Sequence, residues 1–280
     1  MNIRSLLLVL FLTLAVSHTY AQDSTMLVLS YNIRYDNPDD GKNNWHFRKK
    51  VMADYFNGVS PAVIGMQEAL YHQVQYLDSA LTRYDYVGVG RDDGKWKGEF
   101  SPIFYDTAIF SIHCWKTIWL SPTPDTPSIG WDAALPRICT QAVFIEKASA
   151  DTFYVFNTHF DHIGEQARNE SAKLLCSVIR SLPEDAYILC MGDFNAGDDS
   201  RVYDIMTSVL EDSRTIARKK GSNYPTIHEF GKFHDDNPRI DYIFTRNFMV
   251  SYQAHYLNTH ANGDWLSDHL AVGADVRKVK

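Results

Sequence analysis

Short apolar runs bounded by turn residues recur along most of the chain, and they have the length of buried strands. They predict strands over residues 26–33, 62–66, 84–89, 102–105, 107–112, 116–120, 138–146, 152–157, 187–191, 240–244, 248–257 and 270–276. Apolar residues at helical spacing predict helices over residues 47–56, 70–81, 164–182 and 200–210, with loops over 121–136 and 211–238. Because strands outnumber helices and many are sequence neighbours, the pattern favours an α/β protein with two packed sheets flanked by helices over a simple parallel sheet.

The N-terminal segment has a different pattern. Arg4 precedes an apolar run from Leu6 to Val16, and Thr19-Tyr20-Ala21 is a small-x-small cleavage site. The run is shorter than a membrane span, and no cysteine follows it as a lipid anchor would require. We therefore expect a signal peptide over residues 1–21 and one domain over residues 22–280, in a protein exported to the periplasm or the extracellular space. An uncleaved N-terminal anchor is the alternative; no other stretch suggests stable membrane insertion.

Composition excludes several classes of protein. With 45% hydrophobic and 22% charged residues, the 280-residue chain is neither disordered nor a coiled coil nor collagen-like. Removing residues 1–21, whose only charged side chain is Arg4, brings the formal charge from −7 to about −8. An acidic surface repels polyanions, which weighs mildly against tight binding of nucleic acid.

The four cysteines form no CxxC pair, so a zinc knuckle is excluded. Cys176 and Cys190 fall at apolar positions and are expected in the core. Export permits disulfides, and Cys114–Cys139 is the pair to examine first.

Polar residues stand directly at the ends of several predicted strands. They are Asn32, Glu68, His159, Asp193, Asn195, Asp241, Asp268 and His269. Any one of them alone is an ordinary turn residue, helix cap or solvated side chain. Together they predict one cluster of carboxylates, amides and imidazoles if the strand ends converge. Such a set suits Mg²⁺, with Mn²⁺ or Ca²⁺ also possible, and the absence of cysteine argues against structural zinc.

The same residues form an ordered series of short motifs. These are Tyr31-Asn32, Gln67-Glu68, Asn157-Thr158-His159-Phe160, Gly192-Asp193-Phe194-Asn195, Asp241-Tyr242-Ile243 and Ser267-Asp268-His269. The series resembles the endonuclease/exonuclease/phosphatase superfamily, the deoxyribonuclease-like metal-dependent phosphoesterases, over roughly residues 28–272, here as an exported bacterial-type member. The resemblance implies a four-layered α/β sandwich of two mixed β-sheets flanked by helices.

The resemblance also implies roles for individual residues. Glu68 would be the principal metal ligand, helped by Asn32 and Asp268. Asp193 would orient and deprotonate the attacking water as general base, and Asn195 would hold that water and a phosphate oxygen.

The histidines would serve the phosphate. His269 would hydrogen-bond the phosphoryl group while Asp241 fixes its tautomer, and His159 would donate to a phosphate oxygen or to the leaving group. Arg34 stands where some family nucleases have an acidic residue near a proposed second metal. An arginine there argues for one metal; its own role is either a phosphate clamp or a surface position.

Further candidates for substrate contact come from loops. They are Arg91 in the loop 91–100, Trp131, Arg137 and His162, each weighed against ordinary loop packing. The basic run 218–220 is interpreted as a solvated face.

The leading hypothesis is therefore a divalent-metal-dependent phosphoester hydrolase, a phosphodiesterase or phosphatase acting on a small or surface-displayed ester. The first alternative is a secreted endo- or exonuclease acting on DNA or RNA. An alternative from another class is a non-catalytic metal- or ligand-binding module. The sequence indicates no protein partner and no oligomeric state.

Overall fold

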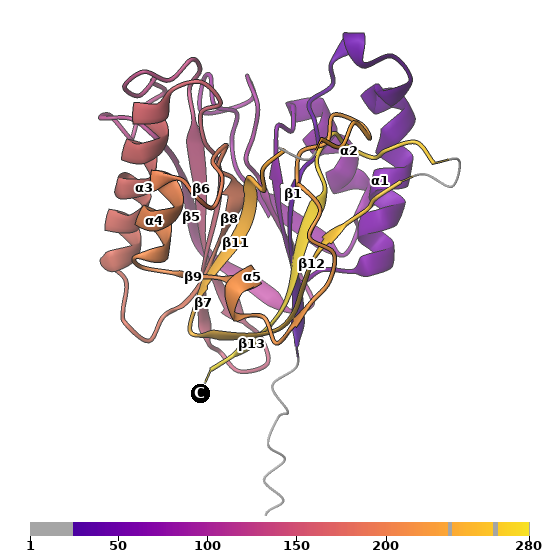
Figure 1. Ribbon diagram of the computed structural model, residues 1–280. Helices are drawn as coiled ribbons and strands as arrows, with labels where there is room; N and C mark the ends of the chain where they lie inside the picture. Colours follow the sequence, from indigo (N-terminus) through magenta and orange to yellow (C-terminus); the bar gives the residue numbers. More distant parts are fainter. Residues whose placement is uncertain (1–24, 235–236, 260–262, 280) are drawn as a thin grey trace, which may run out of the picture.

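Two β-sheets form the centre of the molecule in the computed structural model, which describes residues 25–234, 237–259 and 263–279 (Figure 1). The larger sheet has the order β10 (Lys219–Lys220), β12 (Phe248–Tyr256), β13 (Ala271–Lys278), β1 (Met26–Asn32), β2 (Val63–Gln67), β4 (Ile103–Asp106), β3 (Tyr84–Val87). The smaller has the order β5 (Phe110–Trp119), β6 (Ile138–Glu146), β7 (Thr152–His159), β8 (Tyr187–Asp193), β11 (Asp241–Arg246), β9 (Glu211–Asp212). Both sheets are mixed, because β1–β2 and β7–β8 are parallel and most other pairs are antiparallel.

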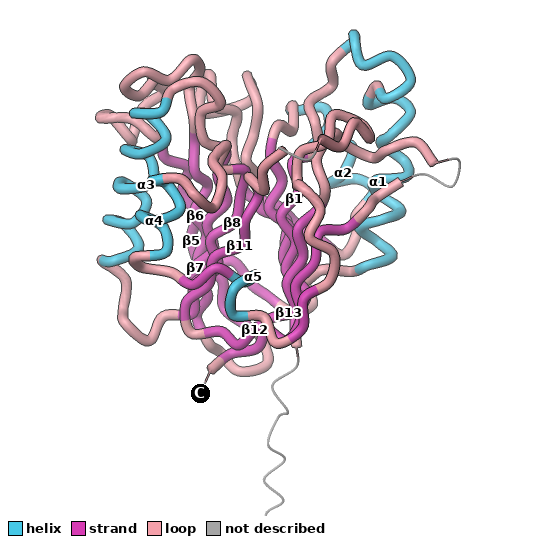
Figure 2. The backbone as a smooth tube through the Cα atoms, in the orientation of Figure 1, coloured by secondary structure: helices cyan, strands magenta, loops and turns pink. Residues whose placement is uncertain are grey.

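Helices cover the outer face of each sheet (Figure 2). The larger sheet is covered by α1 (Trp45–Val59) and α2 (Tyr71–Ala80), and the smaller by α3 (Glu165–Arg180) and α4 (Arg201–Thr207). Two short elements, η1 (Pro38–Asn43) and α5 (Ser213–Ile216), lie in connections. The predicted four-layered sandwich is confirmed.

Three apolar layers hold the sandwich together. Between the sheets, Val63 and Val272 of the larger sheet pack in one cluster with Phe144, Phe153 and Ile243 of the smaller. Two further clusters fill the spaces between each sheet and its helices. Each sheet is therefore buried on both of its faces, which explains why so many strands are apolar along their whole length.

Four predicted elements were wrong in detail. Residues 107–112 and 116–120 do not form two strands, because β5 runs continuously past an irregularity between Ile112 and Cys114. It is an edge strand with most of its middle exposed, so its sequence lacks the apolar pattern of a buried strand. The predicted helix over 200–210 ends at Thr207, and the predicted loop over 211–238 contains β9, α5 and β10. These elements are two to four residues long, too short to leave a periodic pattern.

The disulfide considered between Cys114 and Cys139 is absent, and all four cysteines are free. In the β5–β6 ladder Cys114 lies opposite Val143 and Cys139 lies opposite Ile118. The two cysteines are therefore offset by four positions, roughly 13 Å, which exceeds disulfide reach. Cys176 and Cys190 are buried, as expected.

A polar bridge fixes the two sheets to each other just beneath one edge. Asn157 on β7 donates to the carbonyl oxygens of Met66 (2.6 Å) and Pro102 (2.8 Å), and its Oδ1 accepts from Gln67 Nε2 (2.7 Å). Asn157 and Gln67 are fully buried, so breaking these hydrogen bonds would leave several polar groups unpaired. The bridge therefore sets the relative position of the strand ends next to it.

The predicted signal peptide over residues 1–21 lies outside the described residues. Within the described part of the chain, no helix is long and apolar enough to cross a membrane.

Candidate active site

The polar residues at the strand ends meet at one edge of the sandwich, the edge drawn uppermost in Figure 1. Parallel strands β1, β2, β7 and β8 end there, and β11 and β13, antiparallel to their neighbours, begin there. Within the smaller sheet His159 lies opposite Asp193, and Asp193 lies opposite Asp241. The convergence predicted from sequence therefore occurs.

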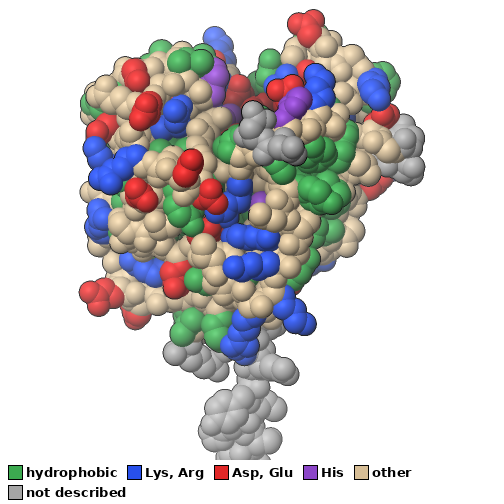
Figure 3. Space-filling model, in the orientation of Figure 1, with side chains coloured by type: hydrophobic (Ala, Val, Ile, Leu, Met, Phe, Trp, Pro, Cys, Tyr) green, Lys and Arg blue, Asp and Glu red, His purple; other side chains and the backbone are tan. Residues whose placement is uncertain are grey.

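A cavity of about 360 Å³ opens between these strand ends. It is lined by Arg34, Tyr35, Glu68, Glu99, Leu135, Arg137, His159, His162, Asp193, Asn195, Ile227, Asp268 and His269. Figure 3 shows the corresponding notch at the upper edge of the molecule, where acidic, basic and histidine side chains gather. Asn32 and Asp241 are fully buried and support the lining residues from beneath.

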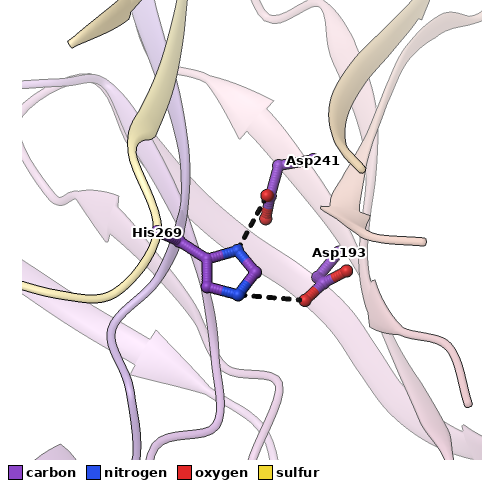
Figure 4. A group of neighbouring side chains, drawn as sticks. All are labelled: Asp193, Asp241 and His269. Carbon is purple, nitrogen blue, oxygen red and sulfur yellow. Dashed lines mark hydrogen bonds and ion pairs between the residues drawn. The ribbon is translucent and has the colours of Figure 1, made fainter. Parts of the chain in front are cut away.

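His269 lies between two buried carboxylates (Figure 4). Its Nδ1 is 2.9 Å from Asp241 Oδ2, and its Nε2 is 3.9 Å from Asp193 Oδ2. Although burial opposes it, the charges of Asp241 and Asp193 raise the pKa of His269 well above its usual value. The imidazole is therefore protonated at neutral pH, with Nε2–H directed toward Asp193.

Burial and the nearby Asp241 carboxylate raise the pKa of Asp193 to about 7, although His269 and two hydrogen bonds oppose the shift. Those bonds come from the Asn195 backbone N–H (2.9 Å) and from Asn32 Nδ2 (3.1 Å). A carboxylate held in one orientation and titrating near neutral pH is suited to accept a proton from a bound water.

We expect Asp241→Asn to lower the pKa of His269 toward its usual value, because the hydrogen-bonded carboxylate is its main stabilising partner. A titration of His269 followed by ¹⁵N NMR measures this directly. Because a raised histidine pKa stabilises the fold below that pKa, the variant should also lose stability selectively at neutral and acidic pH. An unchanged His269 pKa would contradict the pairing.

The carboxylates of Glu68 and Asp268 also line the cavity and form its oxygen-rich wall. Glu68 accepts from Asn32 Nδ2 (3.0 Å) and from the Tyr35 backbone N–H (3.1 Å). Burial and the nearby charge of Glu68 raise the pKa of Asp268, although the positive charges of His269 and Arg34 oppose the shift. Asn32 presents Nδ2 to the carboxylates, so it would offer Oδ1 to a cation only after its amide rotates.

These donors fit a hard divalent cation. Glu68, Asp268 and Asp193 contribute carboxylate oxygens to the same cavity, which is the chemistry that Mg²⁺ prefers. Asp193, Asp241 and His269 also have ligand atoms within 4.8 Å of one another. In that second group, however, His269 already uses Nδ1 for Asp241, so the oxygen-rich wall is the better site.

Three residues near the cavity have a left-handed backbone conformation, which sets the direction of their side chains. Glu68 (φ 64°) directly follows β2, and Asn195 (φ 47°) and Arg34 (φ 58°) lie two residues beyond the ends of β8 and β1; all three have the positive φ of the left-handed region. Such conformations cost about 1–3 kcal/mol each for non-glycine residues and concentrate at functional sites. Arg48, fully buried in α1, holds this region by donating to the carbonyl oxygens of Ile33, Arg34, Asn43 and Leu266.

His159 is neutral. Burial, together with the charges of Arg137 and Arg91, lowers its pKa well below the usual value. Its Nε2 is 3.1 Å from Asn195 Nδ2, which also donates to the Phe160 carbonyl oxygen. Asn195 therefore fixes the ring so that His159 faces the cavity.

The loop candidates for substrate contact divide into two groups. Arg34, Arg137 and His162 line the cavity, whereas Arg91 and Trp131 do not. Arg91 is buried and forms a two-pronged ion pair with Glu99 at 2.7 and 2.9 Å. The sequence analysis predicted substrate contact for Arg91 in the loop 91–100, whereas the structure places Glu99 of the same loop at the cavity.

Glu99 is the principal site residue that the sequence analysis missed. Burial and the nearby Glu68 raise its pKa to about 7, and Oε2 lies 3.9 Å from His159 Nδ1. In the sequence, the only indication that Glu99 lies near the site is its position in a charged, glycine-containing loop. Tyr35, Leu135 and Ile227 also line the cavity and carried no signal. The basic run 218–220 is exposed, as expected.

Comparisons with known proteins show what this chain is similar to. A model of the Endonuclease/Exonuclease/phosphatase family matches residues 29–269. The endonuclease/exonuclease/phosphatase from Bacteroides vulgatus is 37% identical, with a TM-score of 0.87 over 91% of this chain and 99% of that chain. The mannosyl-6-phosphatase from Bacteroides thetaiotaomicron is 37% identical, with a TM-score of 0.84 over 90% of this chain and 99% of that chain. An uncharacterized protein of Acanthamoeba polyphaga mimivirus is 27% identical over 81% of this chain and 90% of its own length.

Proposed function

Because this chain belongs to the endonuclease/exonuclease/phosphatase family, we propose that it is a divalent-metal-dependent phosphatase acting on small phosphate esters. One observation carries the proposal. A cavity of about 360 Å³ brings together an oxygen-rich wall, a proton-accepting carboxylate and a cationic histidine. These are the three functions that hydrolysis of a phosphate ester requires.

The oxygen-rich wall would hold the cofactor, which we take to be Mg²⁺, with Mn²⁺ or Ca²⁺ as alternatives. Glu68 would be the main ligand, with Asp268 and Asn32 beside it. When bound, such an ion neutralises charge on the phosphate oxygens and on the departing oxygen.

Asp193 would act as the general base. Its pKa of about 7 lets it exist as the free carboxylate near neutral pH and still accept a proton. The backbone N–H of Asn195 holds one of its oxygens, leaving the other directed at the cavity with Asn32 and His269 around it. The Asn195 side chain would position the attacking water and a phosphate oxygen.

The two histidines would act on the phosphate in different protonation states. Cationic His269, oriented by Asp241, would donate Nε2–H to a phosphoryl oxygen. Neutral His159 would contact a phosphate oxygen or the departing group from the other side of Asp193. Arg34, Arg137 and His162 would add donors to the lining of the cavity.

The substrate is proposed to be a phosphomonoester, with sugar phosphates as the first class to test. The support is the similarity to a mannosyl-6-phosphatase at 37% identity over 90% of this chain. A nuclease is the second family activity, but the formal charge of −7 does not favour a polyanion. A binding module without activity is disfavoured because the cavity contains candidates for every catalytic role.

A substrate panel with Mg²⁺ tests the proposal. We expect hydrolysis of mannose 6-phosphate and p-nitrophenyl phosphate, loss of activity in EDTA, and little cleavage of DNA or RNA. Cleavage of nucleic acid alone would support the nuclease alternative, and no hydrolysis of any ester would support the binding module.

We also propose that the protein is exported after removal of residues 1–21. Fractionation of the natural host and N-terminal sequencing of the mature chain test this; residue 22 is the expected first residue.

A further inference from the structure

Arg34 is held more firmly than a surface arginine. Its Nε and NH2 donate to the two carboxylate oxygens of Asp40, both at 3.0 Å, and its guanidinium stacks over the Tyr35 ring with 4.7 Å to the centroid. The Asp40 side chain is only 8% exposed, so little water competes with this pair. Arg34 therefore presents a fixed cation.

The backbone of Arg34 is also fixed. Its N–H donates to Asn32 Oδ1 (3.0 Å), and its carbonyl oxygen accepts from Arg48 NH2 and Gln73 Nε2, both at 3.1 Å. These bonds hold the residue at φ 58°, a conformation that arginine rarely adopts. The strain indicates that the direction of this side chain matters.

One edge of the guanidinium remains directed at the cavity. NH1 makes no hydrogen bond to Asp40; it forms an ion pair with Asp268 Oδ2 at 3.4 Å, and both residues line the cavity. Around it, Glu68, Glu99, Asp193 and Asp268 all contribute negative charge to the lining. A phosphomonoester carries close to two negative charges above pH 7, so these carboxylates repel it more strongly than a singly charged phosphodiester.

From this arrangement, and on the premise of the proposed function, we infer that Arg34, oriented by Asp40, selects phosphomonoesters over phosphodiesters. NH1 of Arg34 would donate to a terminal phosphate oxygen that only a monoester has free. In a diester, one more oxygen is esterified, accepts a hydrogen bond poorly and adds bulk where the guanidinium stands. Asp40 is the positioning residue, since it touches Arg34 and does not line the cavity.

The test compares p-nitrophenyl phosphate with bis-p-nitrophenyl phosphate, which release the same leaving group. We expect Arg34→Gln to lower kcat/KM for the monoester about 10- to 100-fold, the value of a charge-assisted hydrogen bond, and to change the diester less than about threefold. Arg34→Lys keeps the charge but loses the planar arrangement of donors, so its kcat/KM for the monoester should lie between those of the wild type and Arg34→Gln. Asp40→Asn should also lower the ratio of kcat/KM for the monoester to kcat/KM for the diester, but by a smaller factor.

Asp39→Asn is the matched control, because Asp39 is exposed in the same short helix and outside the cavity. It should leave both rates and their ratio unchanged. Thermal unfolding and Mg²⁺ titrations of each variant exclude a misfolded protein or a displaced ion as the cause of an effect.

Equal losses on both substrates in Arg34→Gln, or no loss on either, would overturn the inference while leaving the proposed phosphatase intact. Failure of the proposed function has a different signature, because the wild-type protein would then not hydrolyse p-nitrophenyl phosphate with Mg²⁺, whether or not it hydrolysed the diester.

Discussion

Replacing Asp193 with asparagine is expected to lower kcat by about 10³-fold on any phosphate ester the protein hydrolyses. The asparagine keeps the shape and can still accept from the Asn195 backbone N–H, which is 2.9 Å away. What it lacks is a basic oxygen to take the proton of the attacking water. KM should change little, because the carboxylate acts on the water and not on the bound ester.

The fold should tolerate this change. Burial and Asp241 raise the folded-state pKa of Asp193 to about 7, above the value near 3.9 of an unfolded chain. The folded protein therefore binds more protons between about pH 4 and pH 7, and ionising Asp193 costs stability as the pH rises through that range. Asp193→Asn removes this cost, so the metal-free variant should unfold at the same temperature as wild type or a higher one.

Asp198→Asn is the control for this experiment, since Asp198 is a largely exposed acid shortly after the same strand and outside the cavity. It should retain wild-type kcat. A kcat within tenfold of wild type in Asp193→Asn would refute the assignment of the base.

The sequence predicted the site better than it predicted individual contacts. Asp193 and Asp241 follow or begin strongly apolar strands, and placing such strands side by side in a sheet must bring their polar ends together. The observed register, with Asp241 opposite Asp193 and Asp193 opposite His159, realises this expectation. Strand ends were thus informative because the hydrophobic pattern locates them.

Loop residues escaped prediction because their partners depend on how the chain closes. The sequence analysis chose Arg91 from the loop 91–100 and missed Glu99, because nothing in the sequence shows which of the two side chains faces the cavity. The pairing of the Arg91 backbone N–H with the Glu99 carbonyl oxygen (3.1 Å) closes the loop and turns the glutamate toward the site. Likewise, β5 was split in two because an exposed edge strand has no buried face to impose a period.

Replacing Glu68 is expected to lower activity mainly by weakening the binding of the metal ion. It follows β2 directly, and its αL backbone turns the carboxylate into the cavity beside Asp268. Both of its oxygens are held in place, by Asn32 Nδ2 at 3.0 Å and by the Tyr35 N–H at 3.1 Å. A preorganised carboxylate of this kind gives a divalent cation both charge and direction.

Glu68→Gln is therefore expected to raise the Mg²⁺ concentration needed for half-maximal activity by about 100-fold or more. Mutating residues that only orient a metal ligand already lowers metal affinity or activity by about 10- to 100-fold. Calorimetric titration with Mn²⁺ gives the same comparison without turnover and separates lost binding from lost chemistry. Glu165→Gln, at an exposed glutamate outside the cavity, should leave both measurements unchanged. Wild-type Mn²⁺ affinity in Glu68→Gln would place the ion elsewhere, and the group of Asp193, Asp241 and His269 would then be the site to test, because its ligand atoms also lie close enough to share one ion.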